Sequence, residues 1–377
     1  MSTFESLGVK KAYQKALAEL NIVVPTAIQQ ETIPVLLSKK TDFVGLAQTG
    51  TGKTAAFGLP ILHRIDPSKA EIQALILSPT RELVQQIKKQ LFKFTKYTQH
   101  KIFVEGVYGG EKIDLQMAAL KRPTHIVVAT PGRLIDLMER NAINISAIRT
   151  LVLDEADEML SMGFKQELDQ ILRETKNVGQ TWLFSATMPE EIKRIVKDYM
   201  SPNAVKVTLN DREKINPNIK HQYLITHLKN KFNALVRVLE GFGEERGIIF
   251  VRTKLGAQRL FRDLQDEGFS VGALEGDMQQ KERDKVMRAF KNKSLQILIS
   301  TDVAARGIDV RDLSFVIHHQ LPEQLNYYTH RSGRTARAGK TGKAIALVLP
   351  SELQQIHHIQ KELEVDFEEL IPDNPAS

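Results

Sequence analysis

The sequence contains no cysteine. This absence excludes disulfides, thiolate nucleophiles and every zinc site that needs a sulfur ligand. A chain without cysteine fits a reducing compartment, so we expect a cytoplasmic protein.

Long apolar runs are missing as well. No segment approaches the roughly 18 continuous apolar residues of a membrane span, and residues 1–11 hold no apolar run of signal-peptide length. We therefore expect no membrane partner. Fixed-period repeats and low-complexity tracts are also absent, which excludes a solenoid.

The 377 residues are 42% hydrophobic, which is enough apolar material for two ordinary domains, each with its own core. The formal net charge is +7. A basic balance is compatible with a polyanionic partner, although many basic proteins bind none.

Short apolar runs alternate with longer helical patterns along the chain, which predicts an α/β protein with mainly parallel sheets flanked by helices. The runs occupy 42–47, 74–79, 125–131, 150–157, 181–187, 247–253, 296–303, 315–322 and 344–350. A polar, proline-containing stretch at 208–220 lacks helical periodicity and is predicted to be a linker. This linker divides the chain into two predicted α/β domains, at 1–207 and 221–377.

A glycine-rich segment, AQTGTGKT at Ala47 to Thr54, follows one apolar run and precedes a helical pattern. Such a loop lets backbone N–H groups approach phosphates, while its lysine reaches the β and γ phosphates and its last hydroxyl binds magnesium. A chance glycine-rich turn is the alternative. The predicted ATP-binding residues here are Thr49, Gly50, Thr51, Gly52, Lys53 and Thr54.

An acidic cluster, DEAD, follows the apolar run at 150–153. Acidic residues at a helix amino terminus, where they complement the dipole, are the alternative interpretation. Beside a phosphate-binding loop, Asp154 is instead predicted to share the magnesium ion with Thr54, and Glu155 to orient or deprotonate the attacking water. Asp157 is placed to hydrogen-bond to other motifs.

Three arginines recur at steps of three in HRSGRTARAG: Arg331, Arg334 and Arg337. This spacing aims them at a common anion, although a solvated basic face has the same pattern. If they reach across to ATP, they stabilise the transition-state charge as arginine fingers, and catalysis requires the domains to close.

Three loops of the first domain carry groups that suit a sugar-phosphate backbone: PTREL, YGG and TPGR. Their hydroxyls, guanidinium groups and glycine amides bind phosphate without reading base sequence. Ordinary turns and caps explain any one loop alone. The residues predicted to contact RNA are Thr80, Arg81, Gly110, Thr130 and Arg133.

This set of motifs closely resembles the DEAD-box ATP-dependent RNA helicases, in family order from Phe4 to about Gly339. SAT at 185–187 and STDVAARGID at 300–309 belong to the same set. The resemblance implies two tandem RecA-like P-loop domains, with ATP, Mg²⁺ and RNA as ligands.

The resemblance also assigns residues that spacing does not reveal. PTAIQ resembles the family's adenine-recognition motif, with Gln29 reading adenine and Phe4 stacking on it, and Asp309 is implied to hold the ribose. The residues of the second domain implied to contact RNA are Arg252, Thr253, Gln280, Arg283 and Thr301. Those implied to couple ATP to RNA, together with Asp157, are Ser185, Thr187 and His330.

Several positions depart from the family pattern. Asn21 and Ile22 replace a glycine and an aromatic residue, and Ser332 and Ala336 replace isoleucine and glycine. Glu275 stands where histidine is commonest, so we expect a negative charge near the RNA path and weaker RNA affinity.

The resemblance implies an ATP-dependent clamp that binds single-stranded RNA and ATP between two domains, hydrolyses ATP when stimulated by RNA, and locally separates short duplexes. Contacts to the 2′-hydroxyl favour RNA over DNA. Two alternatives are an RNA clamp without unwinding and a DNA helicase of the same superfamily.

Overall fold

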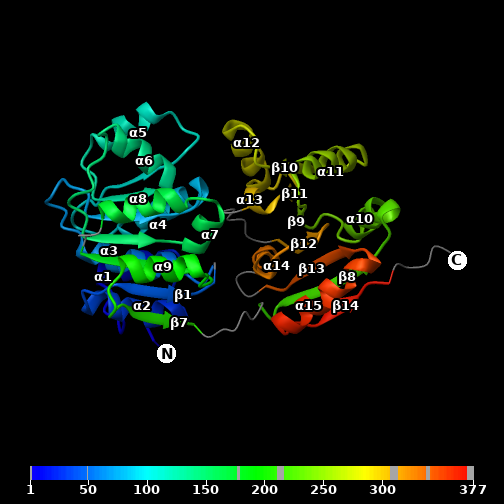
Figure 1. Cartoon of the computed structure of the whole chain (residues 1–377), viewed down its shortest axis with the longest axis horizontal. Helices are drawn as coiled ribbons and strands as arrows, with labels where there is room; N and C mark the ends of the chain where they lie inside the picture. The colour runs from blue at the N-terminus through cyan, green and yellow to red at the C-terminus, as the bar shows by residue number, and fades with distance from the viewer. Residues whose placement is uncertain are drawn as a thin grey trace. The chain divides into compact units, whose positions relative to one another are not determined.

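The computed structural model describes residues 2–48, 50–175, 179–209, 216–305, 313–336 and 340–371. The chain forms two compact units, Met1–Asn210 and Asp211–Ser377, each built around one sheet (Figure 1). The division falls inside the stretch 208–220 that the sequence marks as a linker.

Within the described residues, the sheet of unit 1 has seven strands in the order β3-β4-β2-β5-β6-β1-β7, all paired in parallel. In chain order they are β1 (Phe43–Leu46), β2 (Ala74–Leu77), β3 (Val104–Val107), β4 (Ile126–Ala129), β5 (Thr150–Leu153), β6 (Gln180–Ser185) and β7 (Val205–Thr208).

Helices cover both faces of this sheet, and each face has its own apolar cluster (Figure 1). One face packs against α1 (Lys11–Glu19), α2 (Ala27–Ser38), α3 (Lys53–Arg64) and α4 (Arg81–Phe94). The other packs against α5 (Ile113–Leu120), α6 (Pro131–Glu139), α7 (Ala156–Ser161), α8 (Lys165–Glu174) and α9 (Glu190–Tyr199). Strands enclosed on both sides can be apolar throughout, as β2 and β4 are, and β5 is apolar apart from Thr150.

Unit 2 repeats this plan. Its described strands form a parallel sheet in the order β10-β11-β9-β12-β13-β8-β14. They are β8 (Ile219–Ile225), β9 (Gly247–Phe250), β10 (Val271–Leu274), β11 (Ile297–Ser300), β12 (Phe315–His318), β13 (Gly342–Val348) and β14 (Phe367–Glu369).

Helices again form two layers in unit 2. One face packs against α10 (Lys231–Glu240) and α11 (Lys254–Asp266). The other packs against α12 (Gln280–Lys291), α13 (Asp302–Ala305), α14 (Leu325–Ser332) and α15 (Leu353–Leu363). Short 3₁₀ turns at Leu228–Asn230 and Pro350–Glu352 precede α10 and α15.

The predicted α/β class with parallel sheets flanked by helices is confirmed in both units. Each of the nine apolar runs supplies a strand. None of the helices in the described ranges has the length and apolarity needed to cross a lipid bilayer.

The strand register aligns the carboxyl ends of unit 1 along one edge. Leu77 pairs with both Leu153 and Ala129, and Leu46 pairs with Ser185. Ligands of open α/β sheets bind at this edge. The loops that follow β1, β2, β4, β5 and β6 are therefore the candidates for the site.

Three histidines of unit 2 lie in apolar surroundings that oppose protonation. Burial lowers the pKa of His221 and of His319 to about 4, and it lowers the pKa of His318 well below its usual value. His221 is 5% exposed, and its Nδ1 lies 2.7 Å from the Tyr328 hydroxyl. Since burial disfavours the charged imidazole, these side chains stay neutral in the folded unit.

We expect acid to destabilise unit 2 through these side chains. The pKa of His221 is about 4 when folded and about 6.5 when unfolded, so its contribution is complete above pH 6.5 and is lost between pH 6.5 and 4. The loss amounts to about 3 kcal/mol for His221 alone. Denaturation of the full chain across this pH range should show a smaller slope for His221→Asn, and an unchanged slope would contradict the prediction.

Candidate functional site

The glycine-rich loop connects β1 to α3 in unit 1, as predicted. Gly50 and Gly52 have φ values of 87° and 93°, in the left-handed region that favours glycine. A Cβ on Gly52 would lie 2.4 Å from Gln29 Nε2, so no larger residue fits. Lys53 is the first residue of α3, and its buried Nζ donates to Ala47 O at 3.1 Å. Thr49 lies outside the described residues.

Gln29 fastens this loop to the start of α2. Its Nε2 donates to Gly52 O at 3.0 Å, and its Oε1 accepts from Thr26 N at 3.0 Å. The Thr26 hydroxyl donates to Thr51 O at 2.7 Å. Helical pattern alone makes Gln29 a surface residue, but it is only 2% exposed. The signal is nonlocal, because its partner Gly52 lies 23 residues further along the chain.

Phe4 lies in the apolar cluster under α1 and α2 and is 5% exposed. Stacking on adenine needs an open ring face, which the packing of Phe4 does not offer in this conformation. Its stacking role therefore stays a prediction.

The acidic cluster follows β5 at the carboxyl edge. Asp154 is buried, and burial raises its pKa to about 7, while the charge of Lys53 acts in the opposite direction. Glu155 has a left-handed φ of 52°, which is uncommon for a residue with a Cβ and typical of functional sites. Its side chain does not cap α7, whereas Asp157 and Glu158 lie in the first turn of that helix, where acidic residues complement the dipole.

Asp157 connects the acidic cluster to the SAT segment at the end of β6. Its Oδ2 accepts from Thr187 N at 2.9 Å and from Thr187 Oγ1 at 2.8 Å. Ser185 is buried, and its hydroxyl donates to Thr187 O at 2.7 Å. The structure thus brings together three of the four residues predicted to couple ATP to RNA.

The donors beside the glycine-rich loop suit a hard divalent cation. Asp154 Oδ1 is buried and has no hydrogen-bond partner among the described residues, and Thr54 offers a hydroxyl on the first turn of α3. Within the described ranges no three His, Asp or Glu residues cluster as a metal site. Magnesium typically takes one or two protein oxygens and completes its shell with phosphate and water, so this sparse donor set fits.

The three predicted RNA-contacting loops of unit 1 meet at the ends of β2, β3 and β4. The Thr80 hydroxyl caps α4 by accepting from Leu83 N, and the Arg81 guanidinium lies 5.0 Å from the centroid of the Tyr108 ring. Gly110 has φ 80° in the loop after β3, and Thr130 is at the N-cap of α6. The three loops that the sequence predicts to contact RNA therefore lie next to one another at one edge of the sheet.

Arg133 points into this region and holds the loop after β3. Its Nη1 donates to Glu111 O at 3.1 Å and to Gln116 Oε1 at 3.0 Å, and 11% of its side chain is exposed. Gln116 also holds Tyr108 in place, because its Nε2 donates to Tyr108 O at 2.9 Å. No local pattern marks Gln116, because its role depends on contacts that only the fold creates.

In unit 2 the predicted RNA-contacting residues follow the neighbouring strands β9, β10 and β11. The Thr253 hydroxyl caps α11 by accepting from Gly256 N at 3.0 Å, and Arg252 is exposed beside it. Arg283 Nη2 donates to Ala304 O at 2.6 Å, which ties α12 to α13, the helix that begins directly after Thr301. Gln280 donates to Asp284 Oδ1 at 2.9 Å.

Glu275 turns inward. It is 6% exposed, its Oε2 accepts from Asp277 N at 2.7 Å, and its Oε1 accepts from Gln258 Nε2 at 3.2 Å. The carboxylate stabilises its own loop, and its effect on RNA affinity stays a prediction.

Arg331 does not share a common anion with the other arginines, so this part of the spacing argument is wrong. It is 2% exposed and forms a bidentate ion pair with Asp302, at 2.6 and 2.7 Å, while its Nη1 donates to Gln320 O at 2.8 Å. Arg334 is half-buried and donates from Nε to His330 O at 3.2 Å. Asp309 and Arg337 lie outside the described residues.

The two residues that replace glycine in the family pattern keep the left-handed backbone conformation that glycine adopts easily. Asn21 and Ala336 have φ values of 57° and 55°, a region that asparagine adopts readily and alanine at a cost. Ile22 packs against the core of unit 1. Ser332 is fully buried, with its hydroxyl 3.2 Å from His318 Nε2.

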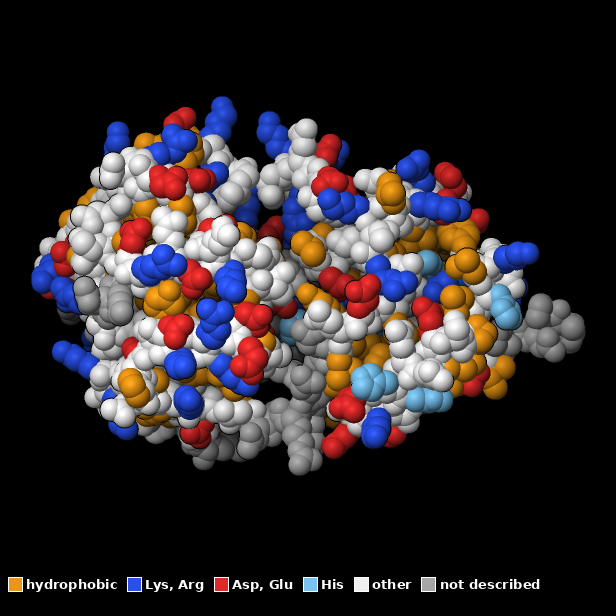
Figure 2. Space-filling view, in the orientation of Figure 1, with side chains coloured by type: hydrophobic (Ala, Val, Ile, Leu, Met, Phe, Trp, Pro, Cys, Tyr) orange, Lys and Arg blue, Asp and Glu red, His pale blue; other side chains and the backbone are white. Residues whose placement is uncertain are grey.

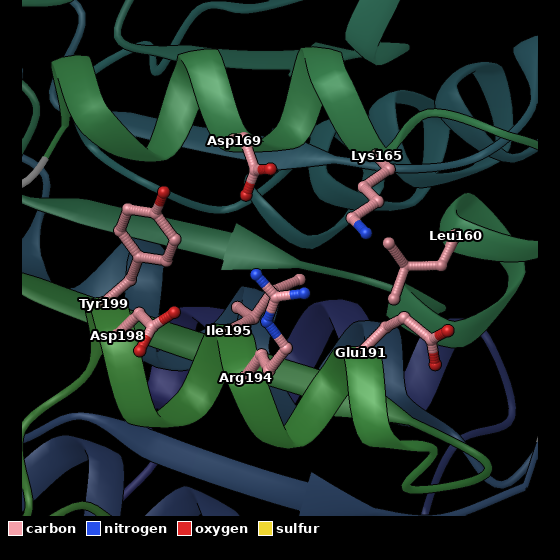
Figure 3. A pocket seen from close by; sticks show the side chains of 8 residues that line it. All are labelled: Leu160, Lys165, Asp169, Glu191, Arg194, Ile195, Asp198 and Tyr199. Atoms are coloured by element: carbon pink, nitrogen blue, oxygen red, sulfur yellow. The ribbon is translucent and has the colours of Figure 1, made fainter.

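A shallow pocket between α8 and α9 lies outside this set of motifs (Figure 3). Lys165 and Asp169 point from α8 towards Arg194 of α9, over a floor that includes Ile195. Both signs of charge line it, so it favours no single class of ligand. None of its residues is predicted to bind nucleotide or RNA.

Two family models match the chain: DEAD/DEAH box helicase over residues 26–195, and Helicase conserved C-terminal domain over residues 230–339. The DEAD-box ATP-dependent RNA helicase CshA of Geobacillus kaustophilus is 42% identical over 373 residues, covering 99% of this chain and 79% of that protein. The RNA helicase CrhR of Synechocystis is 44% identical over 368 residues, covering 97% and 74%.

Solved structures match across both units. Dbp5 of S. cerevisiae bound to RNA and ADP BeF3 has a TM-score of 0.86 at 32% identity, covering 98% of this chain and 96% of that chain. Mss116p bound to ssRNA and AMP-PNP has a TM-score of 0.87 at 30% identity, covering 99% and 80%. The predicted pair of tandem RecA-like domains is confirmed by this agreement.

Proposed function

This chain belongs to the DEAD-box ATP-dependent RNA helicases, and we propose that it binds ATP and single-stranded RNA with residues of both units, hydrolyses ATP when stimulated by RNA, and locally separates short RNA duplexes. One observation carries most of the proposal. Lys53, Asp154 and Glu155 converge at one sheet edge, where Asp157 joins them to Thr187 of the SAT segment.

Nucleotide binding rests on the loop between β1 and α3. Its N–H groups surround the phosphates, and Lys53 exchanges its contact with Ala47 O for the β and γ phosphates. Thr54 and Asp154 would hold a magnesium ion, whose charge would offset that of the phosphates and favour the ionised Asp154 carboxylate. Gln29 reads adenine, because its amide already lies against the loop, with Phe4 as the stacking ring and Asp309 on the ribose.

Hydrolysis rests on a base in unit 1 and cations in unit 2. Glu155 accepts a proton from the attacking water as that water approaches the γ phosphate. Arg334 and Arg337 stabilise the charge that develops on the transferred group, an effect worth about 10³-fold or more in turnover. The proposal therefore requires both units to meet over one nucleotide.

RNA binding rests on sugar-phosphate contacts, which read no base sequence. Contacts to the 2′-hydroxyl provide the preference for RNA over DNA. The proposed contacts are Thr80, Arg81, Gly110, Thr130 and Arg133 in unit 1, and Arg252, Thr253, Gln280, Arg283 and Thr301 in unit 2. Asp157, Ser185, Thr187 and His330 transmit the state of the ATP site to them.

The first test is the steady-state ATPase rate without nucleic acid, with single-stranded RNA, and with DNA of matching sequence. We expect strong stimulation by RNA and little by DNA, because only RNA offers the 2′-hydroxyl. A high rate without RNA, or equal stimulation by DNA, would preserve the ATPase and overturn its RNA specificity.

Strand displacement from a short labelled duplex distinguishes an unwinding helicase from an RNA clamp that does not unwind. Release of the labelled strand upon ATP addition supports unwinding. RNA-stimulated hydrolysis without release would replace unwinding by an ATP-gated clamp, and the residue roles at the ATP site would stand.

A further inference from the structure

The outer surface of α4 and the segment after it carry charge of mainly one sign. Between Glu82 and Glu105 the chain contains five lysines and no acidic residue. Over α8 and α9, by contrast, both signs of charge are interspersed (Figure 2). Long stretches of one charge sign in a folded helix attract a partner of opposite sign.

The lysines of α4 share one face of the helix. Its buried residues are Val84, Ile87, Leu91 and Phe94, which pack against the sheet. Lys89, Phe92 and Lys93 lie on the opposite side of α4, and Lys96 follows two residues after its end; all four are exposed. We refer to these four residues as the α4 patch.

Two lysines of the α4 patch keep their charge available. Lys96 pairs with Glu19, and the neighbouring Lys88 pairs with Glu105 at 2.7 Å. Lys89 and Lys93 form no ion pair within the described part of the chain. The α4 patch therefore presents two free ammonium groups one helical turn apart.

Phe92 lies between these lysines and is 70% exposed. An exposed phenylalanine at the centre of a basic surface gains no burial energy from the fold. Nucleic-acid bases stack on such rings, while neighbouring lysines bind the backbone phosphates. Aromatic and basic side chains together fit a single strand better than they fit an acidic protein surface.

The α4 patch is continuous with the proposed RNA site. Arg81, the first residue of α4, lies over the Tyr108 ring, and Gln85, one turn later, donates to the Tyr108 hydroxyl at 3.0 Å. Arg81, Gln85, Lys89 and Phe92 follow one side of a helix of 14 residues, which is about 21 Å long. A strand held at Arg81 can therefore extend along α4.

We propose that the α4 patch is an additional binding surface for single-stranded RNA, which extends the strand from the loop at Arg81 along the outer face of α4. Lys89 and Lys93 neutralise backbone phosphates, and Phe92 stacks on one base. The proposal rests on the RNA-binding function proposed above. The α4 patch makes RNA affinity depend on the length of the RNA, which contacts to the motif residues alone do not.

The test compares wild type with the triple variant Lys89→Gln, Phe92→Ser, Lys93→Gln. The control variant is Lys193→Gln, Lys197→Gln, which removes two lysines with the same spacing from α9, on the opposite face of the sheet. Affinity in the presence of a non-hydrolysable ATP analogue is measured for two RNAs, one of about 8 nucleotides and one roughly three times longer, at several salt concentrations.

We expect the triple variant to bind the longer RNA roughly tenfold more weakly, with a salt slope smaller by about 1.4, because two phosphate contacts are lost. Its affinity for the short RNA should match wild type, as should both affinities of the control. An unchanged affinity for the longer RNA, or an equal loss with both RNAs, would overturn the α4 patch while leaving RNA-stimulated ATPase in place. Loss of RNA stimulation in wild type would overturn the proposed function itself.

Discussion

Glu155→Gln should abolish ATP turnover while the protein still binds ATP and RNA. Glutamine has the size of glutamate but cannot accept a proton from water at neutral pH. Removing a positioned base typically costs about 10²- to 10⁴-fold. The substitution leaves Lys53, Thr54 and Asp154 in place, so nucleotide binding should persist. Single-turnover hydrolysis of bound ATP measures the chemical step directly, and release of labelled RNA from the stalled complex should be slow.

The control for this variant is Glu158→Gln. Glu158 is also buried, lies in the first turn of α7, whose N-cap is Glu155, and has no assigned part in hydrolysis. Turnover close to wild type is expected from it, since the change spares the water and the phosphates. Rapid hydrolysis by Glu155→Gln would remove Glu155 as the base, and equal losses in both variants would point to damage of α7 instead.

The sequence predicted the centre of each sheet better than its edges. The nine apolar runs supply β1, β2, β4, β5, β6, β9, β11, β12 and β13. The strands without such a run are β3 and β7 at the edges of one sheet, β10 and β14 at the edges of the other, and β8 beside β14. Central strands are covered on both faces and are mainly apolar, whereas β7 and β14 are half exposed and carry polar residues.

Strand order could not be predicted from the pattern. β1 lies between β6 and β7, more than 130 residues away in sequence. Parallel pairing depends on long crossover connections, and the periodicity of a single strand does not encode its neighbours. The resemblance to a known family supplied this information instead.

Local chemistry identified the loops of the site, but not the direction of each side chain. Lys53 and Asp154 were predicted from residue type next to a strand end, because these roles follow from position in the chain. Arg331 was placed wrongly, and the charges of both Arg331 and Glu275 turn inward to partners that spacing does not reveal. Burial of a charge is a property of the fold, so sequence position alone does not show it.

Arg331 points inward, so substituting it tests whether its ion pair with Asp302 stabilises the loops of unit 2. Its guanidinium, fully enclosed, binds both oxygens of Asp302 and lies 5.1 Å from the centroid of the Phe250 ring. Asp302 begins α13, directly after Thr301, and Arg331 lies in α14 beside His330. The ion pair therefore joins two segments that carry proposed RNA-contacting and coupling residues.

Asp302→Ala should destabilise unit 2 by about 3 to 5 kcal/mol, because it leaves a buried guanidinium without its counterion. Arg331→Leu should cost less, since the Asp302 carboxylate is 23% exposed and keeps some contact with water. The double variant should recover much of the loss, because no unpaired charge remains. Asp277→Ala is the control: its exposed ion pair with Lys254 is worth about 0 to 1 kcal/mol. Denaturation of the full chain measures all four. If the two single losses simply add in the double variant, Arg331 and Asp302 do not depend on each other and the ion pair is not what joins the segments.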